Sequence, residues 1–188
     1  MISIRNYLVA FYAVVVVATS VYAQTFNNVV VDANSGDQSE TSIAIEPNHP
    51  NHLMATWNDF SIGSYSKPGW AFSTDGGNNW YAKGTITPSA SDLYGFDPSC
   101  TIGTNGNEYY AYIASSGSGN YGPVDVSIST NDGQSWSTHQ ASQYPSDHDK
   151  PYIAIDNTSS SYKGNIYVAY ESSYLDNNGV HPEKWTRS

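Results

Sequence analysis

The sequence predicts an all-β protein, and three observations support this prediction. The chain of 188 residues contains 15 glycines, and 14% of its residues are aromatic, among them 16 tyrosines. Only 13% of the residues are charged, and runs of Ser, Asn and Thr separate short apolar stretches. A chain this aromatic is not disordered, and one this rich in glycine and turn-forming residues is not mostly helical.

Acidic residues outnumber basic ones, which restricts the possible partners. Seven Lys and Arg face 17 Asp and Glu, so the formal net charge is −10. Nucleic-acid binding needs clustered cations, and we therefore expect no nucleic-acid partner. The acidic surface also disfavours anionic polymers, which leaves neutral glycans or glycoproteins as the expected partners.

The amino end has the pattern of a secretory signal peptide over residues 1–23. Arg5 precedes an apolar run over residues 7–17, and small residues lead to an expected cleavage site after Ala23. The run is too short to span a bilayer comfortably. We therefore expect a secreted protein, extracellular or periplasmic, with no membrane attachment after cleavage; the alternative is an uncleaved anchor helix. Residues 24–38 form a lead-in.

The rest of the chain is a threefold repeat. Its copies open at Glu40, Asp97 and Lys150, which are 57 and 53 residues apart. Each opening is followed by a turn and a second strand-like run, at residues 53–57, 109–113 and 166–170, with period-2 alternation clearest in the third. Asn105-Gly106 suits a tight hairpin turn between two of these runs. Third strands are expected at residues 70–73 and 124–129, and a fourth strand at the Trp that closes each of the first two copies.

Four antiparallel strands in a repeat of this length match one blade of a β-propeller. The predicted blades are residues 39–95, residues 96–148 and a third, truncated blade at residues 149–188. The fold class is therefore an incomplete β-propeller of about two and three-quarter four-stranded antiparallel blades, preceded by a signal peptide. The alternative is a short, self-contained β-sandwich.

A turn motif recurs 56 residues apart, and it is the most specific signal in the sequence. Its pattern is S-x-D-x-G-x-x-W, with Asn replacing Asp in the second copy. The Ser and Asp or Asn oxygens accept backbone hydrogen bonds within the turn, Gly adopts a left-handed conformation, and Trp packs beneath. The residues of the two copies are Ser73, Asp75, Gly77 and Trp80, and then Ser129, Asn131, Gly133 and Trp136.

These motifs resemble the Asp-box, or BNR, repeats of the sialidase superfamily. The resemblance implies that each motif joins the third and fourth strands of a propeller blade, away from the active site, and is structural. In the same alignment Ser188 takes the first position of a third Asp-box. We therefore expect this sequence to be an amino-terminal fragment whose remaining blades follow residue 188.

The sialidase resemblance also implies three arginines that bind the sugar carboxylate, the first in an R-I-P segment. Alignment places that arginine at Ser39, which carries no charge. Beyond the predicted signal peptide the one arginine is Arg187, next to the third Asp-box and thus toward the outer strands. Ordinary sialidase chemistry therefore does not fit this part of the chain.

Acidic residues at strand ends are the candidate catalytic groups: Glu40, Asp59, Asp97 and Asp149. If they converge at the mouth of a propeller channel, they form a carboxylate pair for glycoside hydrolysis or an oxygen-rich Ca²⁺ site. The alternative is that they satisfy turn backbone groups. His148 is expected to be a solvated loop residue. No metal site is predicted, because the histidines show no ligand spacing.

Two functions remain open. The first is a secreted, sialidase-like glycoside hydrolase whose remaining catalytic groups lie beyond residue 188. The second is a non-catalytic extracellular binding or adhesion propeller. Aromatic residues in or beside strands are mostly expected in the core, with a sugar-stacking platform as the alternative; they are Trp57, Tyr110, Tyr112, Tyr152 and Tyr170. The lone Cys100 is expected to be a small core residue. The sequence predicts no oligomeric state.

Overall fold

The computed structural model describes residues 27–61, 63, 65–88, 93–116, 122–142, 148–172 and 183–188. These residues form eleven strands and no helix, which confirms the all-β prediction. None of the described segments is an apolar helix long enough to cross a membrane. The predicted signal peptide at residues 1–23 lies outside the described residues.

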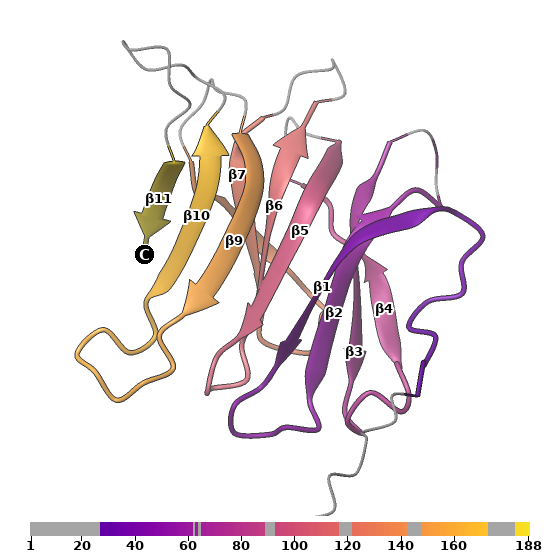
Figure 1. Cartoon of the computed structure of the whole chain (residues 1–188), viewed down its shortest axis with the longest axis horizontal. Helices are drawn as coiled ribbons and strands as arrows, with labels where there is room; N and C mark the ends of the chain where they lie inside the picture. The colour runs from indigo at the N-terminus through magenta and orange to yellow at the C-terminus, as the bar shows by residue number, and fades with distance from the viewer. Residues whose placement is uncertain are drawn as a thin grey trace, which may run out of the picture.

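The strands form three separate antiparallel sheets, one for each predicted repeat (Figure 1). The first two sheets have four strands each, and the third has three described strands. Each strand pairs with its neighbour in the chain, so every sheet is a simple meander. The first sheet contains β1 (Gln38–Ile45), β2 (Leu53–Asp59), β3 (Lys67–Ser73) and β4 (Ala82–Thr85). The second contains β5 (Tyr94–Ile102), β6 (Glu108–Ser115), β7 (Val124–Ser129) and β8 (Ser137–Gln140). The third contains β9 (His148–Ile155), β10 (Ile166–Ser172) and β11 (Glu183–Arg187).

The sheets stand side by side, with their first strands β1, β5 and β9 in one row (Figure 1). One apolar cluster fills the space between the first and second sheets, and it includes Met54, Phe72 and Tyr110. A second cluster lies between the second and third sheets, with Val126, Ile153 and Val168 among its members. Burial of these side chains stabilises each sheet only through its neighbour, as expected of serial repeats.

The first strand of every sheet carries an irregularity at the same repeat position. Glu40, Asp97 and Lys150 have positive φ angles of 52°, 55° and 47°. At each of them the strand pairing shifts register against the second strand of the same sheet. This conformation is uncommon for residues other than glycine and strains the backbone at all three positions. Backbone strain of this kind clusters at functional sites.

Serine side chains tie the first strands of successive sheets together. The Ser42 hydroxyl accepts a hydrogen bond from the Cys100 amide at 3.3 Å, and the Ser99 hydroxyl accepts one from the Ile153 amide at 3.1 Å. The two serines occupy the same repeat position. Two equivalent hydrogen bonds therefore set the spacing between β1 and β5 and between β5 and β9.

Both turns that resemble Asp-boxes, called Asp-box turns from here on, have the predicted hydrogen bonds. The Ser73 hydroxyl accepts from the Gly77 amide at 2.8 Å and donates to Asp75 Oδ1 at 2.9 Å. The Ser129 hydroxyl accepts from the Gly133 amide at 2.9 Å and lies 3.3 Å from Asn131 Oδ1. Each turn joins the third and fourth strands of its sheet, so the structural role expected of these residues fits their geometry.

The two motif tryptophans lie on equivalent faces of their sheets. The Trp136 ring packs against Trp70 and Phe72 of the first sheet, at centroid distances of 5.8 and 6.4 Å. Trp80 packs on the corresponding face of the first sheet, against a cluster that contains Trp57 and also contacts Val31 of the lead-in. Trp80 thus covers the face of the first sheet that contacts the lead-in, and Trp136 covers the face of the second sheet that contacts the first sheet.

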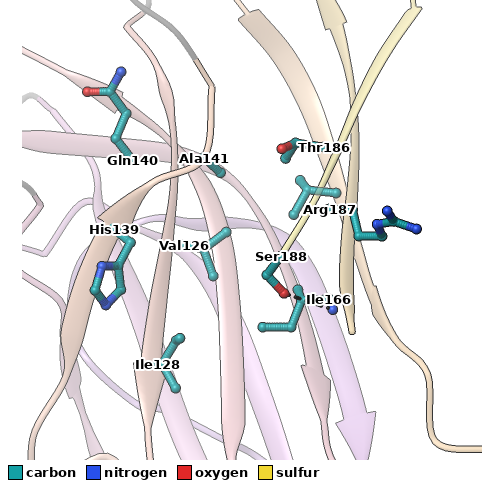
Figure 2. A pocket seen from close by; sticks show the side chains of 10 residues that line it. Val126, Ile128, His139, Gln140, Ala141, Ile166, Thr186, Arg187 and Ser188 are labelled. Carbon is teal, nitrogen blue, oxygen red and sulfur yellow. Dashed lines mark hydrogen bonds between the residues drawn. The ribbon is translucent and has the colours of Figure 1, made fainter. Parts of the chain in front are cut away.

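A cavity of about 370 Å³ separates the outer strands of the second and third sheets (Figure 2). Val126 and Ile128 line it from β7, at the positions that Trp70 and Phe72 hold in β3. Ile166 and Ser188 line it from the third sheet. The cavity therefore corresponds to the place that Trp136 occupies between the first and second sheets.

One expectation about a single residue was wrong, and it concerns the row of first strands. His148 is buried at the start of β9, with its ring 4.7 Å from that of Tyr170, and is not a solvated loop residue. Tyr152 is exposed, because its position in β9 points out of the sheet stack. The other four aromatic residues named above are buried, as is Cys100, and burial raises the pKa of that thiol to about 11.

Candidate functional site

The three strained residues of the first strands converge on one cleft of about 170 Å³. The cleft is lined by three consecutive residues from each of β1, β5 and β9: Glu40, Thr41, Ser42, Asp97, Pro98, Ser99, Lys150, Pro151 and Tyr152. It lies at the end of the sheets opposite the Asp-box turns, because the openings of the repeats and the Asp-boxes are at opposite ends of the strands. Each sheet therefore contributes the same part of its repeat to one site.

Lys150 joins the acidic residues of the two preceding sheets. Its Nζ lies 3.0 Å from Glu40 Oε2 and 3.9 Å from Asp97 Oδ1. Its backbone amide donates a hydrogen bond to Asp97 Oδ2 at 3.4 Å. The Asp97 side chain is mostly buried, whereas those of Glu40 and Lys150 are partly open to solvent. The charges are thus reachable from outside and held by groups from all three sheets.

Asn58, a buried residue of β2, holds Glu40 and Asp97 in place through hydrogen bonds to both. Its Nδ2 donates to Glu40 Oε2 at 3.3 Å, and its Oδ1 accepts from the Asp97 amide at 3.1 Å. An amide side chain that donates on one side and accepts on the other holds both strands at a defined distance. Buried polar residues that are fully hydrogen-bonded in this way rigidify a site.

The pKa values of the two neighbouring acids, Asp97 and Glu40, shift in opposite directions. Burial, together with contacts with the Glu40 and Asp149 carboxyl groups, raises the pKa of Asp97 to about 8, while Lys150 opposes the shift. The hydrogen bond from Asp97 lowers the pKa of Glu40 against the effect of burial, and Lys150 and Asn58 add to the lowering. At neutral pH, Asp97 therefore carries a proton and donates it toward an ionised Glu40.

This arrangement is suited to proton transfer. A carboxylic acid that stays protonated near neutral pH can act as a general acid, and its ionised neighbour can act as the base. The neighbouring ammonium is itself stabilised, because Glu40 and Asp97 outweigh burial and raise the pKa of Lys150. The exposed Tyr152 ring offers an aromatic face beside the acids.

The structure brings together three of the four predicted acids. Glu40 and Asp97 line the cleft, and Asp149 contacts Asp97 from an exposed position on β9. Asp59 is buried at the end of β2, where its Oδ1 accepts a hydrogen bond from the Ser61 amide at 2.8 Å. Its place in the fold is therefore that of a turn cap, the alternative considered for strand-end acids.

Sequence reasoning missed Lys150 and Asn58 as members of the site. The signal for Lys150 was present, since it occupies the same repeat position as Glu40 and Asp97. Asn58 carries no such signal, because its role depends on the register between β1 and β2.

The position aligned with the sialidase arginine lies next to this site but is uncharged. The Ser39 hydroxyl there accepts a weak hydrogen bond from Asn58 at 3.5 Å. Arg187 belongs to β11, the outer strand of the third sheet, with its guanidinium 5.9 Å from the Tyr162 ring. Among the described residues lining the cleft, the one cation is the Lys150 ammonium, a point charge without the fork geometry that binds carboxylates in pairs.

No protein-family model and no curated protein matches the chain. Among solved structures, a study of the GH130 family of mannoside phosphorylases and of glycoside hydrolases that target β-1,2 mannosidic linkages in Candida mannan supplies one similar chain, at 14% identity and a TM-score of 0.48. A candidate glycoside hydrolase from Bacteroides ovatus has 12% identity and a TM-score of 0.47, and a candidate glycosidase from Bacteroides thetaiotaomicron has 18% and 0.46. The three alignments cover 81%, 78% and 80% of this chain and 53%, 51% and 53% of the others, so the chain spans about half their length.

Proposed function

We propose that the chain is part of a secreted, sialidase-like Asp-box propeller that acts on neutral glycans as a glycoside hydrolase. The observation that carries the proposal is the pair of carboxyl groups that share a proton in an open cleft, Asp97 and Glu40. Glycoside hydrolysis needs a carboxylic acid that is protonated at the working pH to donate to the leaving-group oxygen. Asp97 is assigned that role, and Glu40 is its ionised partner.

The proposal assigns proton transfer, and no nucleophilic role, to this pair. Carboxyl groups in hydrogen-bond contact lie closer together than the separation of about 5 Å or more that nucleophile and acid keep in glycosidases. A neutral glycan is favoured over a sialoside because the cleft presents two acids and one ammonium. Tyr152 offers an exposed ring to the apolar face of a sugar.

The test is hydrolysis by the complete protein of which this chain is proposed to be a part, assayed on fluorogenic neutral glycosides and on sialosides. We expect turnover of at least one neutral glycoside and none of the sialosides. Asp97→Asn and Glu40→Gln should each lower kcat/KM by at least about 100-fold, the usual scale of general acid–base catalysis. Asp59→Asn is the matched control, since it changes a buried strand-end acid that caps a turn, and it should retain activity.

A second candidate is a non-catalytic glycan-binding propeller. It is favoured by the Lys150–Glu40 ion pair of 3.0 Å, which engages the acids with each other and with the ammonium. In that case no glycoside would be hydrolysed, but neutral glycans would bind. A Tyr152→Ala variant would then weaken glycan binding while leaving the melting temperature unchanged.

A further inference from the structure

A second polar cluster lies at the other end of the sheets, between the first and second sheets and close to the Asp-box turn. It contains His52, from the turn before β2, together with Glu108 at the start of β6 and Asp132 in the second Asp-box. One ligand atom of each residue lies within 4.8 Å of the other two. Nε2 of His52 is 3.3 Å from Asp132 Oδ1 and 3.9 Å from Glu108 Oε1.

The imidazole of His52 is oriented with Nε2 toward the two carboxylates. Its Nδ1 lies 2.9 Å from Glu46 Oε2, and its ring stacks on Phe72 with centroids 5.7 Å apart. In the neutral tautomer with its proton on Nδ1, the ring donates to the Glu46 carboxylate, which only accepts hydrogen bonds, and the lone pair of Nε2 points toward the two other carboxylates. A carboxylate that receives the other ring N–H is the usual support of a histidine that binds a metal.

Glu108 is the independent sign that a ligand belongs here. Its side chain is fully buried; the Ser129 hydroxyl lies near it, but no hydrogen bond of normal geometry reaches either carboxylate oxygen from the described residues. A buried carboxylate without a partner is costly, because nothing replaces the water that it loses. With that tautomer of His52, Glu108 Oε1 faces another acceptor at 3.9 Å, and a cation between them would satisfy both.

Comparison between repeats shows that both acids depart from the pattern of the fold. In the strand registers Glu108 takes the place of Leu53 in the first sheet and of Ile166 in the third. Asp132 takes the place of Gly76 and keeps its positive φ, 55° against 72°. Neither substitution helps a sheet or a turn, since one buries a charge and the other strains the backbone. Both place a carboxylate beside the same imidazole.

We propose that His52, Glu108 and Asp132 bind one divalent transition-metal ion of the Zn²⁺ class, which joins the first two sheets at their Asp-box end. Imidazole and carboxylate together suit Zn²⁺ better than Ca²⁺, which takes oxygen ligands. Bonds of about 2.0–2.1 Å in a tetrahedron place ligand atoms about 3.4 Å apart, close to the 3.3 and 3.9 Å observed. The fourth position is left to water.

The test uses the full chain, freed of metal by a chelator, with Zn²⁺ as the probe. Equilibrium dialysis with metal analysis should give one tightly bound Zn²⁺ per chain, and saturating Zn²⁺ should raise the melting temperature. Co²⁺ bound in its place should give the visible absorption of a tetrahedral site. A rise in melting temperature with Ca²⁺ but not with Zn²⁺ would overturn the proposal, as would the lack of one saturable site.

Three variants separate this site from adventitious binding to histidine. Asp132→Gly restores the residue of the first Asp-box and relieves the positive φ, so the protein should fold at least as well as the unmodified chain while binding Zn²⁺ at least about tenfold more weakly. His52→Gln should weaken binding similarly. His49→Gln is the control, since that exposed ring also contacts Glu46 but is not part of the cluster, and it should bind as before. Equal Zn²⁺ affinity in Asp132→Gly and the unmodified chain would refute the assignment.

Discussion

Lys150 places its ammonium 3.0 Å from the carboxylate of Glu40, although the two residues belong to the third and the first sheet. Both residues have positive φ angles and occupy the same position of the repeat. The pairing therefore follows from the serial arrangement of the sheets, which brings equivalent residues from successive copies together. The three repeats place different side chains at this position, the acids Glu40 and Asp97 and the base Lys150, and this difference allows them to form an ion pair.

Stability should fall as the pH rises from about 4 to about 8, in part because of Asp97. The pKa of this carboxyl is raised to about 8 in the folded state from an ordinary value of 3.8. The folded protein thus holds a proton that the unfolded chain releases in this interval, and the stability linked to it is lost as the pH approaches 8. The measurement is the melting temperature across this range.

The Asp97→Asn variant identifies the residue responsible. Its amide keeps the hydrogen-bonding shape without titrating, so the decline in melting temperature between pH 4 and 8 should be shallower than in the unmodified chain. Equal slopes in Asp97→Asn and the unmodified chain would contradict the shifted pKa.

The glycines of the two Asp-box turns should differ in their tolerance of alanine. Gly77 and Gly133 both have positive φ, 85° and 74°, so alanine costs each turn about 1–2 kcal/mol. A Cβ on Gly133 would also lie 2.5 Å from the Trp70 ring, whereas one on Gly77 finds its nearest neighbour at 3.8 Å. We expect Gly133→Ala to cost about 1–3 kcal/mol more than Gly77→Ala, measured by urea unfolding.

Equal losses in these two variants would show that Gly133 is not packed against the first sheet. The comparison is controlled within the molecule, because the two turns share their hydrogen-bond pattern. A difference therefore reports contact between sheets and not the turn itself.

Replacing either of the two motif serines, Ser73 or Ser129, with alanine should lower the free energy of unfolding by a similar amount. Ser129→Ala removes the acceptor of the amide of the buried Gly133, and Ser73→Ala does the same for the half-buried Gly77. An unsatisfied amide costs about 1–3 kcal/mol. Each variant should lose stability in this range by urea unfolding, and a loss below about 0.5 kcal/mol in either would contradict the buttressing role of the hydroxyl.

Filling the cavity between the second and third sheets should stabilise the fold. Appending a copy of residues 130–142 after Ser188 would supply an Asp-box whose tryptophan can reach the cavity lined by Val126, Ile128 and Ile166 (Figure 2). Against the same extension carrying alanine in place of that tryptophan, we expect a gain of about 2 kcal/mol, or a melting temperature higher by about 4–8 °C. Identical melting temperatures would mean that the cavity does not correspond to the Trp136 site.

The sequence was sufficient to predict the repeat, the meander of each sheet and the Asp-box hydrogen bonds. Each of these depends on residues close together in the chain, such as Ser73 and Gly77, and on a pattern that recurs. The sequence left open whether Glu40, Asp59, Asp97 and Asp149 converge or cap turns. The structure groups Glu40, Asp97 and Asp149 and places Asp59 in a turn.

What the sequence did not predict depends on register and on contacts between copies. The hydrogen bonds of Asn58 to Glu40 and Asp97 require the pairing of β1 with β2, and the capping role of Asp59 requires the turn after β2. The histidines showed no ligand spacing because His52, Glu108 and Asp132 come from three different turns and strands. His148 was misjudged because its flanking acids suggest solvent, while its own side chain packs against Tyr170.

The most direct measurement is the pKa of Asp97, followed by carboxyl ¹³C NMR in the unmodified chain and in Glu40→Gln. Adjacent acids from successive sheets predict a value of about 8 that falls in the variant, because the Glu40 carboxylate is one of the groups that raises it. A pKa near 4 that does not change in Glu40→Gln would contradict the convergence of the repeats on a shared site.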